Sequence, residues 1–159
     1  MTNDAPRVRT CLWFDRGALP AAEFYCSLLA DSRIERVDRY PEGHEIGEPG
    51  TVLSVDFTLA GTPYLAINGG THFTLDEAVS ILVATEDQAE TDRLWGALID
   101  GGAESRSGWL TDRFGLSWQI VPKRALELMR GPQSGPVWAA LLPMRKIDIA
   151  ALEAAAKAR

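Results

Sequence analysis

The second half of the sequence repeats the pattern of the first half, and this repeat constrains the fold more than any other feature. Residues Thr10–Arg36 lie over Ser80–Arg106 with a shift of 70 positions and no gap. Apolar runs fall on apolar runs, and pairs of large apolar residues coincide, such as Phe24-Tyr25 with Leu94-Trp95. Because self-similarity at a fixed period indicates a repeated structural unit, we expect one module used twice.

Each module is predicted to contain one strand, one helix and three further strands. Module 1 spans about residues 9–68; its helix opens near Pro20, and its strands are predicted at Arg9–Phe14, Arg33–Arg39, Val52–Leu59 and Thr62–Asn68. Module 2 spans about residues 79–122; its strands are predicted at Ser80–Ala84, Ala103–Arg106, Gly108–Thr111 and Leu116–Val121. We expect Thr85 and Gln88 to start the helix of module 2 as a capping box.

The predicted fold class is α+β, with two tandem βαβββ modules that form a curved mixed sheet around a central cavity. A C-terminal helical tail, residues 124–159, lies outside the repeat. It is predicted to hold helices at Arg124–Arg130, Val137–Met144 and Asp148–Ala158, the last of them capped by Asp148. Residues 1–159 are expected to form a single domain. The tail packs either on this domain or on a second subunit, and we expect a homodimer.

The composition excludes several classes of partner. The net charge is -6, from 16 basic and 22 acidic residues, and no cluster of Lys and Arg exists that would bind nucleic acid. No run approaches the roughly 20 apolar residues that span a bilayer, and the N-terminus lacks the apolar core of a signal peptide. We expect a cytoplasmic protein with no membrane partner. Cys11 and Cys26 share no metal-type spacing and are expected to be buried free thiols.

Several motifs together resemble one known group of proteins. They are "LWFD" with "AAEFY", "LAINGG", "DEAVSI", "GWLTDRFGLSWQIVP" and "KIDIAALEAA". The chain is similar, from about Thr10 to Ala155, to the PhnB-like branch of the vicinal oxygen chelate superfamily, which includes glyoxalase I, extradiol dioxygenases and bleomycin-resistance proteins. Many members of this branch are described as demethylubiquinone methyltransferases. The chain has no G-x-G-x-x-G turn of the kind that holds a nucleotide-type cofactor, and this argues against methyl transfer.

The resemblance also implies where a divalent metal would lie. Superfamily enzymes bind it on the first and last strands of each module. The repeat carries the first-strand positions onto Thr10 and Ser80, and alignment of the turn glycines Gly61 and Gly115 carries the last-strand positions onto Leu65 and Gln119. None of the four is a histidine or a carboxylate, the side chains that hold Zn, Ni, Fe or Mn strongly. We therefore expect no metal and no other cofactor. His44 and His72 fall in predicted loops and are not expected to be ligands.

Gln119 is the most informative of these positions, and two interpretations of it stay open. Its amide either anchors a bound molecule or is satisfied inside the core by Ser80 or Thr10. Asn68 and Trp109 complete the set of candidate cavity residues. We expect Trp118 to lie on the opposite face of the strand, and Asp112 to bond the backbone of its own turn.

Two classes of function fit this pattern, so whether the protein is an enzyme stays open. The first is a binding protein that holds a small, partly aromatic molecule in the cavity without the usual metal. The alternative is a metal-dependent lyase, isomerase or dioxygenase that acts on a small metabolite. A third interpretation is a dimeric scaffold without a ligand.

Overall fold

The computed structural model describes residues 6–158, which fall into two compact units that divide after Leu75. Unit 1 contains the following elements: β1 (Thr10–Phe14), α1 (Ala18–Leu28), β2 (Arg33–Arg39), β3 (Val52–Leu59) and β4 (Thr62–Asn68). Unit 2 begins with the elements β5 (Ser80–Thr85), α2 (Gln88–Ile99), β6 (Ala103–Glu104), β7 (Trp109–Thr111) and β8 (Ser117–Pro122). Its helical tail follows as α3 (Lys123–Arg130), α4 (Ser134–Leu141) and α5 (Ile149–Lys157).

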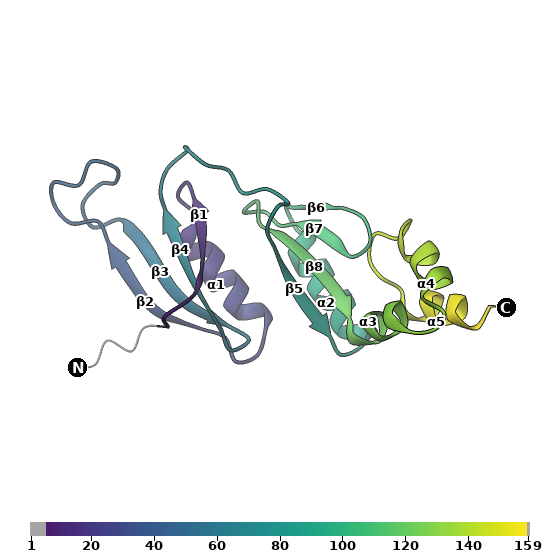
Figure 1. The fold of residues 1–159 in the computed structure, drawn as a ribbon. Coiled ribbons are helices and arrows are strands. Elements are labelled where there is room, and N and C mark those ends of the chain that lie inside the picture. Colours follow the sequence, from purple (N-terminus) through teal and green to yellow (C-terminus); the bar gives the residue numbers. More distant parts are fainter. Residues whose placement is uncertain (1–5, 159) are drawn as a thin grey trace. The chain divides into compact units, whose positions relative to one another are not determined.

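The two units have the same topology. The strand order is β1-β4-β3-β2 in unit 1 and β5-β8-β7-β6 in unit 2. In each sheet the first and last strands pair in parallel, and the other pairs are antiparallel. The α+β class and the repeated βαβββ order are thus confirmed, in the form of two open four-stranded sheets (Figure 1).

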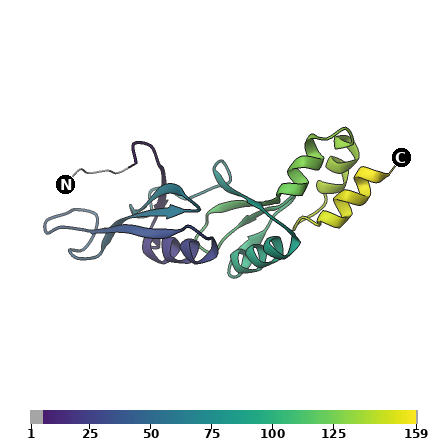
Figure 2. The same ribbon diagram turned by 90° about the horizontal axis from the view of Figure 1, so that it is seen from below.

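One helix covers one face of each sheet and forms the core there (Figure 2). In unit 1, Tyr25 of α1 is fully buried, and its ring centroid lies 6.5 Å from that of Phe57 on β3. In unit 2, Leu94, Trp95 and Leu98 of α2 are buried. The opposite face of each sheet is not covered by this helix, and we call it the helix-free face. The predicted site residues of unit 2 are found there, while Val121 at the far end of β8 meets the tail.

The start of α2 differs from the predicted capping box. Asp87 is the N-cap, and its Oδ1 accepts from the backbone N–H of Glu90 at 2.8 Å. Glu90 Oε2 in turn accepts from the N–H of Glu86 at 2.7 Å. Thr85 is fully buried, and its hydroxyl lies 2.6 Å from the Thr91 hydroxyl, so the hydroxyl of Thr85 is used inside the unit instead of at the helix end. The predicted cap was wrong by two residues.

Asp112 organises the turn that leads into β8. Its Oδ1 accepts from the N–H groups of Phe114 at 2.8 Å and Leu116 at 3.1 Å, as expected for a turn aspartate. Its Oδ2 accepts from the indole N–H of Trp118 at 2.8 Å. Trp118 is buried on the helix-covered face, as predicted, and Asp112 is buried with it. This carboxylate therefore joins the turn to the core.

The tail packs on its own unit, which was one of the two alternatives left open. Val121 at the end of β8 shares an apolar cluster with residues of the three tail helices and of the connector before α5: Ala125, Val137, Leu141, Ile147 and Leu152. Gln88 of α2 adds a polar clamp, because its Nε2 donates to the carbonyl of Ile147 at 3.0 Å and its Oε1 accepts from the N–H of Ile149 at 2.9 Å. The homodimer stays a prediction.

The two cysteines are free, but neither is fully buried, contrary to expectation. Cys11 is exposed and Cys26 is half-buried. Cys11 lies on the helix-free side of β1, where α1 does not cover it, and this explains the difference. Among residues 6–158, no helix is both long enough and apolar enough to cross a membrane.

Replacing Asp112 tests the role of the buried turn. Asp112→Ala leaves buried N–H groups without an acceptor, and we expect the free energy of unfolding to fall by about 3 kcal/mol. Urea denaturation followed by near-ultraviolet circular dichroism measures the change. The control is Asp100→Ala, which removes an exposed carboxylate 3.4 Å from Arg113 and is expected to change stability by less than about 0.5 kcal/mol. Equal effects of the two variants would contradict this role.

Candidate functional site

Three of the predicted site residues, Ser80, Trp109 and Gln119, lie on the helix-free face of unit 2. Gln119 on β8 has two register partners, Trp109 on β7 and Leu82 on β5, which was not predicted. The side chains of Trp109, Gln119 and Leu82 therefore form one row across the sheet. Gln119 Nε2 donates to Ser80 Oγ at 2.9 Å. The contact with Ser80, which was one of the two interpretations left open for Gln119, is therefore present, and it uses one of the two amide N–H groups of Gln119.

Ser117 belongs to the same face and was missed by sequence reasoning. It is the register partner of Ser80 and lies two residues before Gln119 on β8. Its side chain is only 1% exposed, and Oγ has no hydrogen-bond partner among residues 6–158. The period-two alternation of "SWQIV" was the available signal, since it puts Ser117 and Gln119 on one face.

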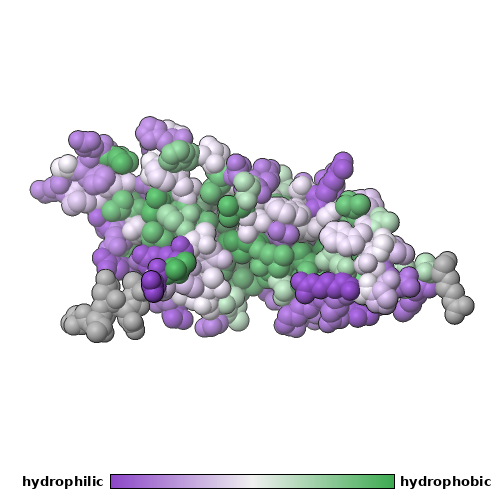
Figure 3. Space-filling view, in the orientation of Figure 1, coloured by the Kyte–Doolittle hydropathy of each residue, from purple (hydrophilic) through white to green (hydrophobic). Residues whose placement is uncertain are grey.

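We call Ser80, Leu82, Trp109, Ser117 and Gln119 the Gln119 surface. Leu82 is 46% exposed, while Trp109 and Gln119 are half-buried. Figure 3 shows apolar side chains gathered over β5 and β8 in this view. The surface therefore combines an indole and an aliphatic side chain with hydroxyl and amide groups, and none of its five side chains carries a charge. This chemistry suits hydrogen bonding and stacking.

Along β1, the residues that structurally match β5 lie 71 positions earlier in the chain, not the 70 positions of the gap-free repeat. Gln119 pairs with Leu82, whereas its counterpart Leu65 pairs with Cys11. Cys11 is therefore the counterpart of Leu82, which is a shift of 71 positions, and Arg9 rather than Thr10 is the counterpart of Ser80. The cause is loop length, because residues 15–17 join β1 to α1 but only residues 86–87 join β5 to α2.

Thr10 and Leu65 consequently do not share a face. Thr10 is the register partner of Tyr64, and neighbouring residues on a strand point to opposite sides of the sheet. Tyr64 stacks on Phe57 with ring centroids 5.3 Å apart, on the side that α1 covers. Leu65 lies on the helix-free side with Cys11. The structure thus brings together the predicted pair of unit 2 but not that of unit 1.

Asn68 has a structural task in unit 1. Its Oδ1 accepts from the N–H of Ala18 at 2.9 Å, and its Nδ2 donates to the carbonyl of Val52 at 3.0 Å. Gly17, the N-cap of α1, provides no side-chain cap, so Asn68 satisfies a free N–H of this helix from the neighbouring strand. Its predicted contact with a ligand stays a prediction.

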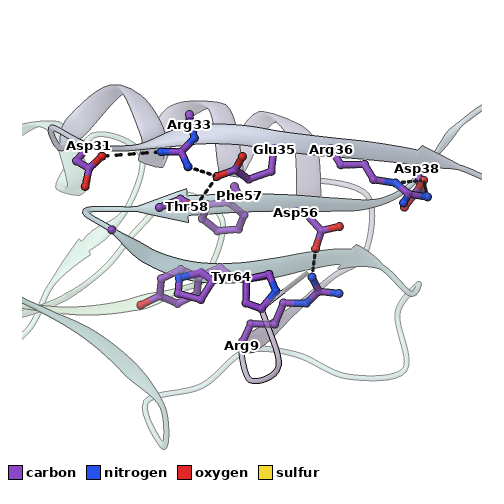
Figure 4. A pocket seen from close by; sticks show the side chains of 13 residues that line it. Arg9, Asp31, Arg33, Glu35, Arg36, Asp38, Asp56, Phe57, Thr58 and Tyr64 are labelled. Atoms are coloured by element: carbon purple, nitrogen blue, oxygen red, sulfur yellow. Dashed lines mark hydrogen bonds and ion pairs between the residues drawn. The ribbon is translucent and has the colours of Figure 1, made fainter. Parts of the chain in front are cut away.

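The helix-free face of unit 1 carries charged groups around a pocket of about 800 Å³ (Figure 4). The pocket is lined by three arginines, Arg9, Arg33 and Arg36. It is also lined by four carboxylates, Asp31, Glu35, Asp38 and Asp56. We call this cavity the unit 1 pocket. Sequence reasoning missed it because the alternating charges of residues 33–39 are typical of an exposed edge strand.

Comparison with known proteins establishes the family. The family model described as 3-demethylubiquinone-9 3-methyltransferase matches residues 6–121. This chain belongs to that family. The PhnB protein from Bacillus cereus is 33% identical, with a TM-score of 0.67 over 74% of this chain and 99% of that chain. A protein from Pseudomonas aeruginosa has 19% identity and a TM-score of 0.61 over 74% of this chain and 98% of that chain, which supports the fold alone. No curated protein matches significantly.

The donor groups of this PhnB-like chain do not fit the divalent metal of glyoxalase-fold enzymes. Ser80 and Gln119 offer a neutral hydroxyl and a neutral amide, and Leu65 offers no donor atom. Across residues 6–158, no three His, Cys, Asp or Glu side chains gather closely enough to hold a metal ion. His44 lies in the loop after β2, with its ring centroid 4.6 Å from that of Tyr40.

Tyr64 gives unit 1 of this PhnB-like chain a measurable titration. Burial raises the pKa of its phenol above the ordinary value. As pH rises the unfolded state loses this proton first, so the stability present below about pH 10 is lost as pH rises through the higher pKa of the folded state. We expect the free energy of unfolding to fall above about pH 10, and to fall less steeply in Tyr64→Phe. Urea denaturation over an alkaline pH series measures this, and identical slopes would show that Tyr64 is not responsible.

Proposed function

We propose that this chain binds a small, partly aromatic molecule at the Gln119 surface without the help of a metal ion. The observation that carries the proposal is the row formed by Trp109, Gln119 and Leu82. An aromatic ring of the ligand stacks on the indole of Trp109 and the side chain of Leu82, while the Gln119 amide between them hydrogen-bonds to a polar substituent of the ligand. Small-molecule sites commonly combine apolar walls with a few fixed polar groups of this kind.

The contacts of Gln119 support this role. The bond to Ser80 fixes the orientation of the amide, so less side-chain entropy is lost when a ligand binds. Ser117 adds a buried hydroxyl on the same face, and leaving such a group without a partner costs free energy that a bound ligand or water recovers. Gln119 is therefore suited both to anchoring the surface and to receiving a polar group of a ligand.

We do not extend the methyl transfer named in the family description to this chain. Transfer from a nucleotide-type methyl donor needs a site for that donor, commonly a glycine-rich turn between a strand and a helix. After β4, the connector from Gly69 to Val79 contains no helix, and the next helix begins only at Gln88 after a further strand. Asn68, the last residue of β4 before this connector, already accepts from the N–H of Ala18 at the start of α1.

A ligand screen with a matched pair of variants tests the binding proposal. We expect a thermal-shift screen of aromatic metabolites and antibiotics to yield compounds that raise the melting temperature. Gln119→Leu removes one neutral hydrogen bond and is expected to weaken their binding roughly three- to tenfold. Gln133→Leu is the control, because Gln133 lies exposed at the start of α4 and makes no side-chain cap. A screen without any binder would favour the scaffold interpretation.

Metal analysis separates the binding protein from the metal-dependent enzyme. We expect protein purified without a metal-affinity tag to contain Zn, Ni, Mn and Fe far below equimolar amounts, because neutral hydroxyl and amide donors do not retain these ions. Elemental analysis by mass spectrometry measures the content before and after incubation with each metal. An equimolar metal that is lost in Gln119→Leu would overturn the proposal in favour of the enzyme.

A further inference from the structure

The unit 1 pocket has the opposite chemistry to the Gln119 surface, although it lies on the equivalent face of the repeat. We propose that this pocket binds an amphoteric small molecule, with an anionic group such as a carboxylate and a cationic group such as an ammonium. Its volume of about 800 Å³ lies within the usual range of small-molecule sites. The inference does not rest on the proposed function, because it concerns different residues.

The anchor of the pocket is the ion pair between Arg9 and Asp56. Arg9 Nη1 lies 2.6 Å from Asp56 Oδ1, and the two side chains are 29% and 20% exposed. Arg9 comes from the segment before β1 and Asp56 from β3, so the pair crosses β4, which lies between these strands (Figure 4). A guanidinium has five N–H donors and a carboxylate about four acceptor positions, so one contact leaves capacity on both partners.

Further pairs continue the pattern along β2. Glu35 Oε1 accepts from Arg33 at 2.9 Å and from the Thr58 hydroxyl at 2.7 Å. Arg36 donates through both Nε and Nη2 to Asp38 Oδ1, at 2.8 and 2.6 Å. These pairs are more exposed than Arg9 and Asp56. The pocket therefore offers closely spaced charges of both signs, and Arg9 with Asp56 is the least exposed of these pairs.

Charge balance decides which class of ligand fits. Three arginines stand against four carboxylates, and pairs of opposite sign run along the pocket wall. A ligand with a single charge must compete with an internal partner and leave that partner without a counterion, which is costly for partly buried groups. A ligand with both charges contacts the guanidinium and the carboxylate of one pair together, and no group is left unpaired. Pro63 lines the same pocket and offers an apolar contact for the ligand body.

Three probes that share a phenylethyl body but differ in their charged groups test the inference on the wild-type protein. They are L-phenylalanine, which carries both charges, 3-phenylpropionate, which lacks the ammonium, and phenethylamine, which lacks the carboxylate. We expect the Kd of phenylalanine to be lower by about tenfold or more than that of either single-charge probe. NMR titration of the labelled protein measures each Kd and locates the site, with shifts expected in residues 31–38 and 56–64. Binding should weaken as salt is added.

A neutral double variant assigns the binding to the anchor pair. Arg9→Met with Asp56→Asn removes both charges at once, so neither is left unpaired, and we expect phenylalanine binding at this site to be lost. The matched control is Arg124→Met with Glu153→Gln, which neutralises an exposed pair in the tail and is expected to leave binding unchanged.

Three results would overturn the inference, and the first two need no variant. They are no advantage of phenylalanine over the single-charge probes, shifts confined to the Gln119 surface, and unchanged binding in the double variant. Shifts at Ser80, Leu82, Trp109 and Gln119 report on the proposed function instead, so the failure of one proposal is distinguished from the failure of the other.

Discussion

The parallel pairing of the first and last strands in each unit is the interaction on which the rest of the structure depends. In unit 2 it places β5 beside β8 and brings Ser80 and Gln119, which are 39 positions apart, into hydrogen-bond contact. In unit 1 the same pairing sets β4 between β1 and β3, and this allows Arg9 to reach Asp56. Parallel strands need a crossover connection, and α1 and α2 begin these connections while covering one face of each sheet.

One topology used twice has produced two surfaces with different chemistry. The helix-free face of unit 2 presents hydroxyls, an amide and an indole, whereas that of unit 1 presents paired charges. The backbone fixes which positions share a face, and the side chains at those positions decide what a face can bind. Membership of the PhnB-like family therefore establishes the fold but does not establish a reaction.

The sequence predicted the fold well where local signals agreed with each other. The hairpin of β3 and β4 was predicted with its observed bounds, because two runs of strand-forming residues flank Ala60-Gly61, and both turn residues have positive φ. The cap of α2 was misplaced because Thr85 fits a capping motif but its hydroxyl is used in the core. Propensity alone could not show which use of that hydroxyl prevails.

The candidate site was predicted only in part, for reasons of register and distance. Ser80 and Gln119 were placed on one face because the repeat and the alignment of the turn glycines Gly61 and Gly115 were in register in unit 2. Thr10 was assigned to the wrong face because the loop before α2 is one residue shorter than the loop before α1. A comparison of the two halves without gaps cannot detect this difference. The unit 1 pocket was missed because Arg9 and Asp56 meet only through the order of the strands.

The attachment of the tail determines whether unit 2 could be shortened to the length of its relatives. The family match ends at residue 121, and the PhnB protein from Bacillus cereus is spanned almost completely by about three quarters of this chain. The tail is joined to the matched region through Val121, the clamp of Gln88, and backbone hydrogen bonds from Ser107 and Gly108 to the carbonyls of Met144 and Arg145. Cutting the chain after β8 would expose Val121 and leave the N–H groups of Ser107 and Gly108 without these acceptors, so the tail is a working part of unit 2.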